Sequence, residues 1–156
     1  MNDAVRRVRE VLAAHGVDDT VQTFDEPVPS AASAAARIGC EVGAIANSLL
    51  FSVDGAPLLV LASGAHRVDT GKLARHRGVG REKVRRADAE LVLEAIGQRA
   101  GGVAPVGHPR PLPTLVDTCL AHHDVVWASA GDEHTVFATT AAGLVAMTGG
   151  TLLDVG

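Results

Sequence analysis

The chain has 156 residues, 47% of them apolar and 21% charged, which is typical of one globular domain with its own core. Its longest apolar runs are too short to cross a bilayer, and its first residues lack the apolar segment of a signal peptide. The two cysteines, Cys40 and Cys119, form no CxxC pair, and we expect them to be reduced. We therefore expect a single domain over residues 1–156, located in the cytoplasm and not in a membrane.

The formal net charge of −4 is unevenly distributed. Residues 66–86 contain eight Lys or Arg side chains and two carboxylates, a net charge of +6, so the rest of the chain carries −10. A basic segment on an acidic protein is a candidate surface for anions or nucleic acid. The alternative is a solvated helical face, since no aromatic side chains are interspersed with the charges to stack on bases.

The first part of the chain predicts two helices and a short strand. Residues 2–15 place Val and Leu at helical spacing, and residues 21–24 alternate like a strand. Ser30 is a good N-cap for an alanine-rich helix over residues 31–38. Residues 41–46 suit a turn or a short helix.

An antiparallel strand pair is the clearest predicted element. Residues 47–53 and 56–63 are apolar, and Asp54-Gly55 between them is a strong hairpin signal. A helix capped by Asp69 and a short strand within residues 81–84 follow.

The remaining segments alternate between helices and short strands. Predicted helical segments are a helix over 89–96 capped by Asp88, a turn over 118–122 and a helix over 141–147 capped by Thr140. Predicted strands cover 115–117, 125–129, 134–139 and, as a frayed tail or an edge strand, 152–155. This irregular order predicts a curved, mixed α/β sheet rather than a doubly wound parallel one.

The stretch Gly101-Gly102-Val103-Ala104-Pro105-Val106-Gly107-His108 combines backbone freedom with constraint. One interpretation is a stiff connection between a helix and a strand. The other is a loop whose backbone N–H groups face a substrate.

Most familiar site patterns are absent. The sequence has no glycine-rich phosphate motif, no GxSxG and no histidine pair at zinc spacing, so we expect no metal and no cofactor. A triad of Ser129, His134 and Asp117 is not favoured, because nothing near Ser129 in the sequence would activate it.

Several short motifs occur in a specific order along the chain. They are Ile45–Phe51, Leu58–Gly64, Arg67–Leu73, Ala87–Asp88, Gly101–Gly107, Pro113–Asp117 and Ser129–Gly131. In this order the chain, from about residue 17 to 149, resembles the YbaK/EbsC family of aminoacyl-tRNA deacylases, which are related to the editing domain of bacterial prolyl-tRNA synthetase.

The resemblance implies a compact α/β domain with a curved, mixed and largely antiparallel sheet, surrounded by helices and enclosing a small pocket. It also implies hydrolysis of the ester between a wrong, small amino acid and a tRNA such as tRNA-Pro. The expected partner is aminoacyl-tRNA, and an association with an aminoacyl-tRNA synthetase is a further implication.

The resemblance also implies site residues. The family's GxxxP loop matches Gly101 to Pro105, so Gly101 and Gly102 are expected at the reacting ester with Pro105 beside them. His134 matches a pocket histidine of some relatives. Ser129 and Gly131 are expected to border the pocket, and Asp117 to shape its wall. Three basic residues are expected to contact the tRNA: Arg67, Lys72 and Arg75.

Asn47 departs from the family pattern, which has a lysine before Ser48. Asparagine is neutral and cannot neutralise a phosphate. Asn47 could replace the lysine as a hydrogen-bonding group, Arg67 or Lys72 could supply the charge, or activity could be lost. Two alternatives therefore stay open: a protein that binds aminoacyl-tRNA ends or small nucleotide or amino-acid ligands without hydrolysis, and a hydrolase for another small acyl ester.

Overall fold

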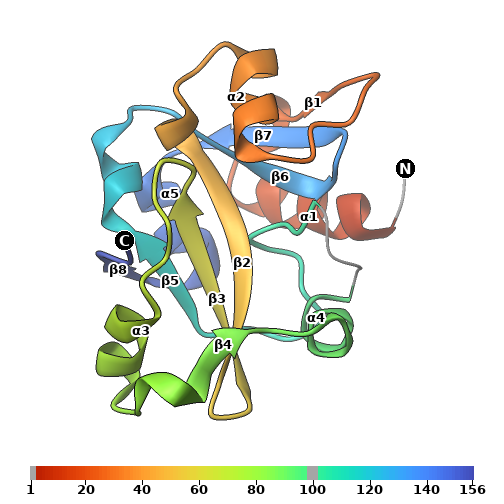
Figure 1. Ribbon diagram of the computed structural model, residues 1–156. Coiled ribbons are helices and arrows are strands. Elements are labelled where there is room, and N and C mark those ends of the chain that lie inside the picture. Colours follow the sequence, from red (N-terminus) through yellow and green to blue (C-terminus); the bar gives the residue numbers. More distant parts are fainter. Residues whose placement is uncertain (1–2, 98–101) are drawn as a thin grey trace.

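The computed structural model describes residues 3–97 and 102–156, which form one mixed sheet with helices around it (Figure 1). Its α-helices are α1 (Asp3–Ala14), α2 (Ala31–Ile38), α3 (Thr70–Arg77), α4 (Ala89–Ile96) and α5 (Ala141–Thr148). Its strands are β1 (Gln22–Thr23), β2 (Ile45–Val53), β3 (Ala56–Ser63), β4 (Val84–Arg86), β5 (Thr114–Asp117), β6 (Val126–Asp132), β7 (Thr135–Thr139) and β8 (Thr151–Leu153).

Four of the helices begin where the sequence predicts, because a side chain caps each first turn. Ser30 accepts the Ser33 amide in a reciprocal capping box at the start of α2. Asp69, Asp88 and Thr140 each accept a backbone amide from the first turn of α3, α4 and α5. Each of these four helices also ends at a glycine, as expected.

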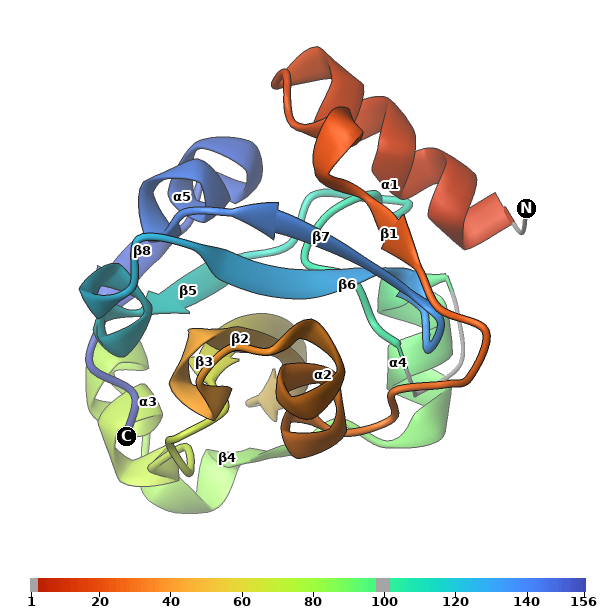
Figure 2. The ribbon, with the colours of Figure 1, turned by 90° about the horizontal axis from the view of Figure 1, so that it is seen from above.

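The strands join in the order β1-β7-β6-β2-β3-β5-β8, and β4 pairs with β2 beside this path. Neighbours β1–β7, β7–β6, β2–β3 and β2–β4 are antiparallel, whereas β6–β2, β3–β5 and β5–β8 are parallel. The sheet is strongly curved: seen from above, β6 and β7 run across the nearly end-on β2–β3 pair (Figure 2). The predicted curved, mixed sheet is confirmed.

The β2–β3 hairpin supplies both faces of the core, because side chains alternate along each strand. Leu50 and Leu61 pack in a cluster that also contains buried residues of α1, α4 and α5. Phe51 and Val60 point to the other face, where α3 and β4 cover them. The hairpin is therefore fixed on both sides. Among the described helices, none is both long and apolar enough to span a membrane.

Several strand boundaries differ from the predicted ones. Strand β6 continues past Ser129 to Asp132 through an irregularity in its pairing with β7. Strand β7 begins at Thr135 and not at His134, because Asp132 Oδ1 accepts the His134 amide and closes the turn. The strand expected within residues 81–84 lies at Val84–Arg86, after a 3-10 turn.

Candidate functional site

Strand β2 has two different neighbours along the edge that does not face β3. At its start, Ile45 and Ala46 pair with β6, and at its end, Phe51 to Val53 pair with β4. Between these two pairings, no strand in the described residues lies beside the edge, although the Ala87 amide donates to Leu50 O at 3.0 Å. The backbone edge of residues 47–49 is therefore not covered by a strand on this side.

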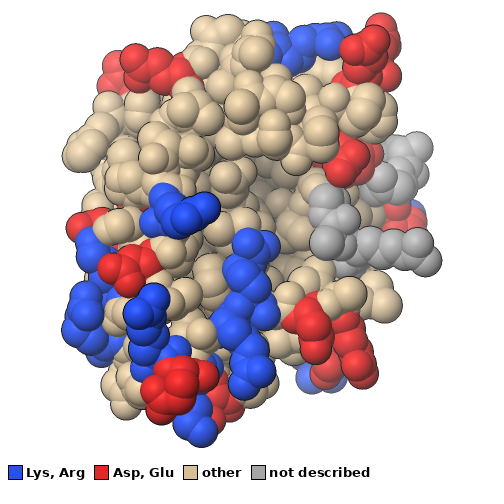
Figure 3. Space-filling model, viewed as in Figure 1, with Lys and Arg blue, Asp and Glu red and all other residues tan. Residues whose placement is uncertain are grey.

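A pocket of about 310 Å³ opens at this interruption. Figure 3 shows the hollow in the middle of this face, above a column of Lys and Arg side chains. Its walls come from the segment entering α2, from β2 and β6, and from the loop after α4. The lining residues are Val28, Pro29, Ser30, Ala31, Ala34, Ile45, Ala46, Asn47, Ser48, Leu49, Leu50, Arg86, Val92, Gly102, Val103, Trp127, Ala128, Ser129, Asp132, Glu133 and Val136.

The β2 wall of the pocket carries two polar side chains that make no hydrogen bond to the described residues. Ser48 Oγ is buried and has no hydrogen-bond partner among the described residues. Asn47, the next residue in the lining, likewise makes no side-chain hydrogen bond within this part of the chain. Buried polar atoms in proteins are nearly always paired, so an unpaired hydroxyl in a pocket marks a position for a ligand atom.

The loop of residues 101–108, which we call the glycine-proline loop, meets the pocket at Gly102. Gly102 has φ +71°, and a Cβ there would lie 2.4 Å from the Asp132 carbonyl carbon, so only glycine fits. The Ser129 hydroxyl donates to Gly102 O at 2.7 Å and accepts the Gly131 amide at 3.2 Å. Ser129 thus fastens the loop to β6. Gly101 lies outside the described residues.

The rest of this loop is anchored in the core. Ala104 and Val106 are buried in the main cluster, and Pro105 is buried without lining the pocket. His108 Nε2 donates to Ala104 O at 2.7 Å, and Arg7 Nε on α1 donates to Gly107 O at 3.2 Å. Burial lowers the pKa of His108 below its ordinary value, although the bond to Ala104 opposes this effect. The loop therefore has a fixed base.

The charged residues in the lining come from two elements. Arg86, at the end of β4, is the one Lys or Arg among the described residues of the lining, and its guanidinium lies over the Phe51 ring at 5.6 Å from the centroid. Asp132 and Glu133 come from the β6–β7 turn, where Asp132 Oδ1 also accepts the Thr135 hydroxyl at 2.8 Å. The pocket therefore offers positive charge at β4 and negative charge at the β6–β7 turn.

Two other residues expected at the site lie outside the pocket lining. His134 Nδ1 donates to Phe24 O at 3.0 Å and joins the segment after β1 to the β6–β7 turn. Gly131 has φ +121° and packs so closely on α1 that a Cβ would lie 2.8 Å from Val5 N. Neither residue lines the pocket.

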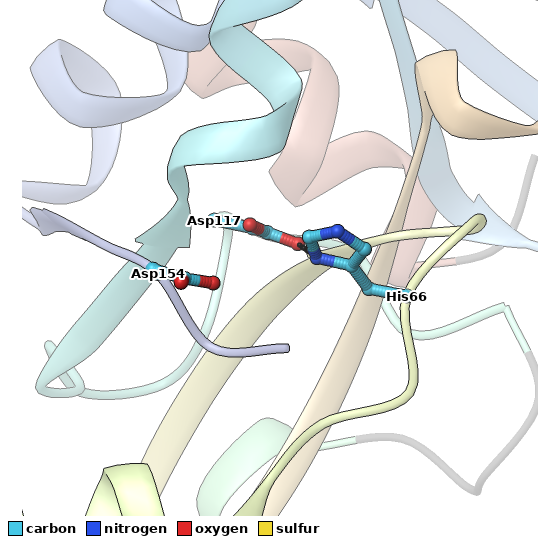
Figure 4. A group of neighbouring side chains, drawn as sticks. All are labelled: His66, Asp117 and Asp154. Atoms are coloured by element: carbon cyan, nitrogen blue, oxygen red, sulfur yellow. Dashed lines mark hydrogen bonds and ion pairs between the residues drawn. The ribbon is translucent and has the colours of Figure 1, made fainter.

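Asp117 belongs to a polar cluster at the other edge of the β2–β3 hairpin. Its fully buried carboxylate accepts the Ser63 and Cys119 amides at 3.0 Å each and His66 Nδ1 at 2.9 Å. Figure 4 shows the His66 ring pointing at this carboxylate, with Asp154 beside them. We refer to His66, Asp117 and Asp154 as the Asp117 cluster. It does not line the pocket.

The Asp117 cluster has the composition of a metal site, since one ligand atom from each residue lies within 4.8 Å of the others. Both Asp117 oxygens are already occupied by protein donors. Lys72 Nζ lies 3.0 Å from Asp154 Oδ2 and supplies the positive charge there. The protein's own hydrogen bonds therefore account for the cluster.

The three basic residues expected to contact tRNA lie on or just before α3. None of Arg67, Lys72 and Arg75 lines the pocket, and Lys72 is engaged with Asp154. Of the site residues expected from the sequence, the pocket lining brings together Asn47, Gly102 and Ser129. Sequence reasoning missed Arg86, Trp127, Asp132 and Glu133, because the strand pairings that bring them to the pocket are long-range.

The chain is similar to known proteins over most of its length. A sequence profile described as an aminoacyl-tRNA editing domain matches residues 25–147. The uncharacterised protein YwhH of Bacillus subtilis is 26% identical over 138 residues, which cover 88% of this chain and 86% of that protein. Proline–tRNA ligase of Geobacter is 28% identical over 102 residues, which cover 64% of this chain and only 18% of the ligase.

A solved structure agrees over nearly the whole chain. The crystal structure of a protein described as a proposed trans-editing enzyme for prolyl-tRNA synthetase is 36% identical, with a TM-score of 0.89. The match covers 99% of this chain and 97% of that one. The likeness therefore extends over nearly the whole fold.

Proposed function

The chain belongs to the family of aminoacyl-tRNA editing domains, and we propose that it is a free-standing hydrolase of mischarged aminoacyl-tRNA. The proposed substrate is a small amino acid esterified to a tRNA such as tRNA-Pro. The observation that carries the proposal is the pocket at the interrupted edge of β2, where the buried Ser48 hydroxyl has no partner among the described residues. A site of action in the cytoplasm and an association with an aminoacyl-tRNA synthetase go with this proposal.

In the proposed reaction, a water molecule attacks the ester carbonyl carbon. The carbonyl–ribose C–O bond then breaks, and the ribose oxygen takes up a proton, so that a free amino acid and an uncharged tRNA leave. The Ser129 hydroxyl donates to Gly102 O, His134 Nδ1 donates to Phe24 O, and Asp117 accepts the Ser63 amide. These three residues therefore do not form a triad. The reaction therefore relies on positioning and on backbone N–H groups near the developing oxyanion.

The pocket is suited to a small aminoacyl group. Its lining is mainly aliphatic, with Ala46 and Ala128 beside Asn47 and Ser48. Asp132 and Glu133 supply negative charge for the α-ammonium group of the ester. Gly101 and Gly102 hold the ester carbonyl, and Ser129 keeps Gly102 in place. In this arrangement Asn47 is a neutral hydrogen-bonding group next to the terminal ribose.

A panel of tRNAs mischarged with different amino acids tests the proposal. Wild-type protein should release a small amino acid from tRNA-Pro faster than it releases proline. Binding without loss of any ester would identify a non-hydrolysing binder instead. Equal hydrolysis of a minimal aminoacyl ester that lacks the tRNA would identify a hydrolase for other acyl esters. The companion variant Asn47→Lys shows whether a positive charge at this position raises the rate.

A further inference from the structure

A second cleft, of about 400 Å³, lies directly beside the pocket. Its lining comes from the β2–β3 turn, from β4 and from the start of α4: Ser52, Asp54, Gly55, Lys83, Arg85, Arg86, Asp88 and Leu91. Arg86 belongs to both linings and marks the passage from the pocket to the cleft, which we call the β4 cleft. Figure 3 shows Lys and Arg side chains running down this face from the hollow.

Arg86 is held in position while its charge is left uncompensated. It pairs with Phe51 across the β2–β4 ladder, and its guanidinium lies over the Phe51 ring. No carboxylate in the described residues forms an ion pair with Arg86, Arg85 or Lys83. Each of these three cations therefore remains available to an anionic ligand.

The acidic residues of the β4 cleft do not cancel this charge. Asp88 caps α4, where its Oδ1 accepts the Leu91 amide at 2.8 Å. Asp54 lies in the hairpin turn. Three cations against two carboxylates leave the cleft with a net positive charge, in a chain whose formal net charge is −4. A local positive field on an acidic protein favours an anionic polymer that extends out of the pocket.

We propose that Arg86 binds the phosphate next to the terminal nucleoside of the substrate, and that the β4 cleft holds the phosphodiester before it. The ligand is thus the single-stranded 3′ end of an RNA, an identity that rests on the proposed function. A guanidinium can bind two phosphate oxygens at once, which orients the chain as well as holding it. The acceptor end enters over β4 and not over α3, where Lys72 is paired with Asp154.

The first test compares two substrates that carry the same aminoacyl group. One is the mischarged tRNA, and the other is the aminoacyl-adenosine, which has no phosphate. Arg86→Gln should lower kcat/KM for the tRNA about tenfold, chiefly through KM, and should lower it far less for the aminoacyl-adenosine. Arg86→Lys keeps the positive charge and should restore part of the loss. Arg77→Gln, an exposed arginine on α3, is the matched control.

Equal losses on the two substrates would overturn the proposal, because they would mean that Arg86 acts on the pocket itself. A larger loss for Arg75→Gln than for Arg86→Gln would also overturn it and would direct the tRNA over α3. Full activity of Arg86→Gln on the tRNA would likewise overturn the proposal.

The second test needs no hydrolysis. Trp127 is the single tryptophan, the chain has no tyrosine, and Trp127 lines the pocket, so its fluorescence reports binding of an uncharged CCA trinucleotide. Arg86→Gln should weaken binding and flatten the slope of log K against log salt concentration by about 0.7, the contribution of one phosphate contact. If wild-type protein hydrolyses nothing, the proposed function fails, yet this titration still shows whether Arg86 binds a phosphate of the RNA end. Identical affinities for Arg86→Gln and Arg77→Gln would overturn its role.

Discussion

Two polar regions flank the β2–β3 hairpin, and they treat their buried groups in opposite ways. On the β3 side, the pairing with β5 is continuous and the Asp117 carboxylate accepts three protein donors. On the β2 side, the pairing is interrupted and Ser48 Oγ has no partner in the described part of the chain. Buried polar groups whose hydrogen bonds are all made within the protein stabilise the fold, whereas an unpaired buried group can still bond a ligand. The difference distinguishes a structural cluster from a site.

The largest expected effect belongs to Asp117. Asp117→Ala leaves the Ser63 and Cys119 amides and the His66 ring without their acceptor, so the free energy of unfolding should fall by about 3–5 kcal/mol. Urea unfolding followed by circular dichroism measures it. The folded fraction should keep its deacylation rate. Undiminished stability together with lost activity would show that Asp117 acts in the functional site and not in stabilising the fold.

A smaller loss is expected at the pocket loop. Gly102→Ala introduces a Cβ against the Asp132 backbone at a positive φ, which should cost about 1–3 kcal/mol and displace the loop. Gly149→Ala is the matched control, since Gly149 has φ +67° with nothing within 4 Å of its Cβ position. The difference between the two unfolding energies isolates the close contact. Equal costs would show that the contact with Asp132 is unimportant.

Two serines give the sharpest contrast in stability. Ser63 is fully buried, and its hydroxyl donates to Gly43 O at 2.8 Å, so Ser63→Ala should cost about 1–3 kcal/mol. Ser48→Ala removes a hydroxyl that bonds nothing in the described residues, so stability should change by less than about 0.5 kcal/mol. Thermal unfolding of the two variants side by side checks this. A large loss for Ser48→Ala would reveal a structural partner and remove the contrast.

The smallest effect concerns pH. Because burial lowers the pKa of His108, the unfolded chain takes up a proton at a higher pH than the folded chain does. The stabilising contribution of neutral His108 is therefore complete above the ordinary pKa of about 6.5 and declines as the pH falls towards the lower folded-state pKa. His108→Gln should flatten the unfolding energy between pH 7 and pH 5, whereas the exposed His76→Gln should not. Parallel pH profiles of all three proteins would contradict this.

Local signals in the sequence predicted most of the elements. The caps Ser30, Asp69, Asp88 and Thr140 lie at the predicted helix starts, and the Asp54-Gly55 turn joins the predicted hairpin. These features depend on neighbours within a few residues. The parallel β2–β6 and β3–β5 pairings join distant segments, and nothing local specifies their register.

The same limit applies to the site. Asn47, Gly102 and Ser129 were expected from the resemblance, and all three line the pocket, although their roles stay predictions. The sequence showed that residues 66–86 are basic, but it did not show which of their side chains lie at the pocket. Arg86 reaches the pocket because β4 pairs with β2, and Lys72 is paired with Asp154 because the segment after β8 passes beside α3. The partner of a charge is a tertiary property.

The most direct test of the account is single-turnover deacylation of alanyl-tRNA-Pro by wild-type, Ser48→Ala and Ser63→Ala proteins, at a temperature where all three are folded. The wild type should release alanine, Ser63→Ala should match it, and Ser48→Ala should be slower by about tenfold, because the unpaired hydroxyl is the one that meets the substrate. Absence of alanine release by the wild type, or a rate for Ser48→Ala equal to that of the wild type, would contradict the account.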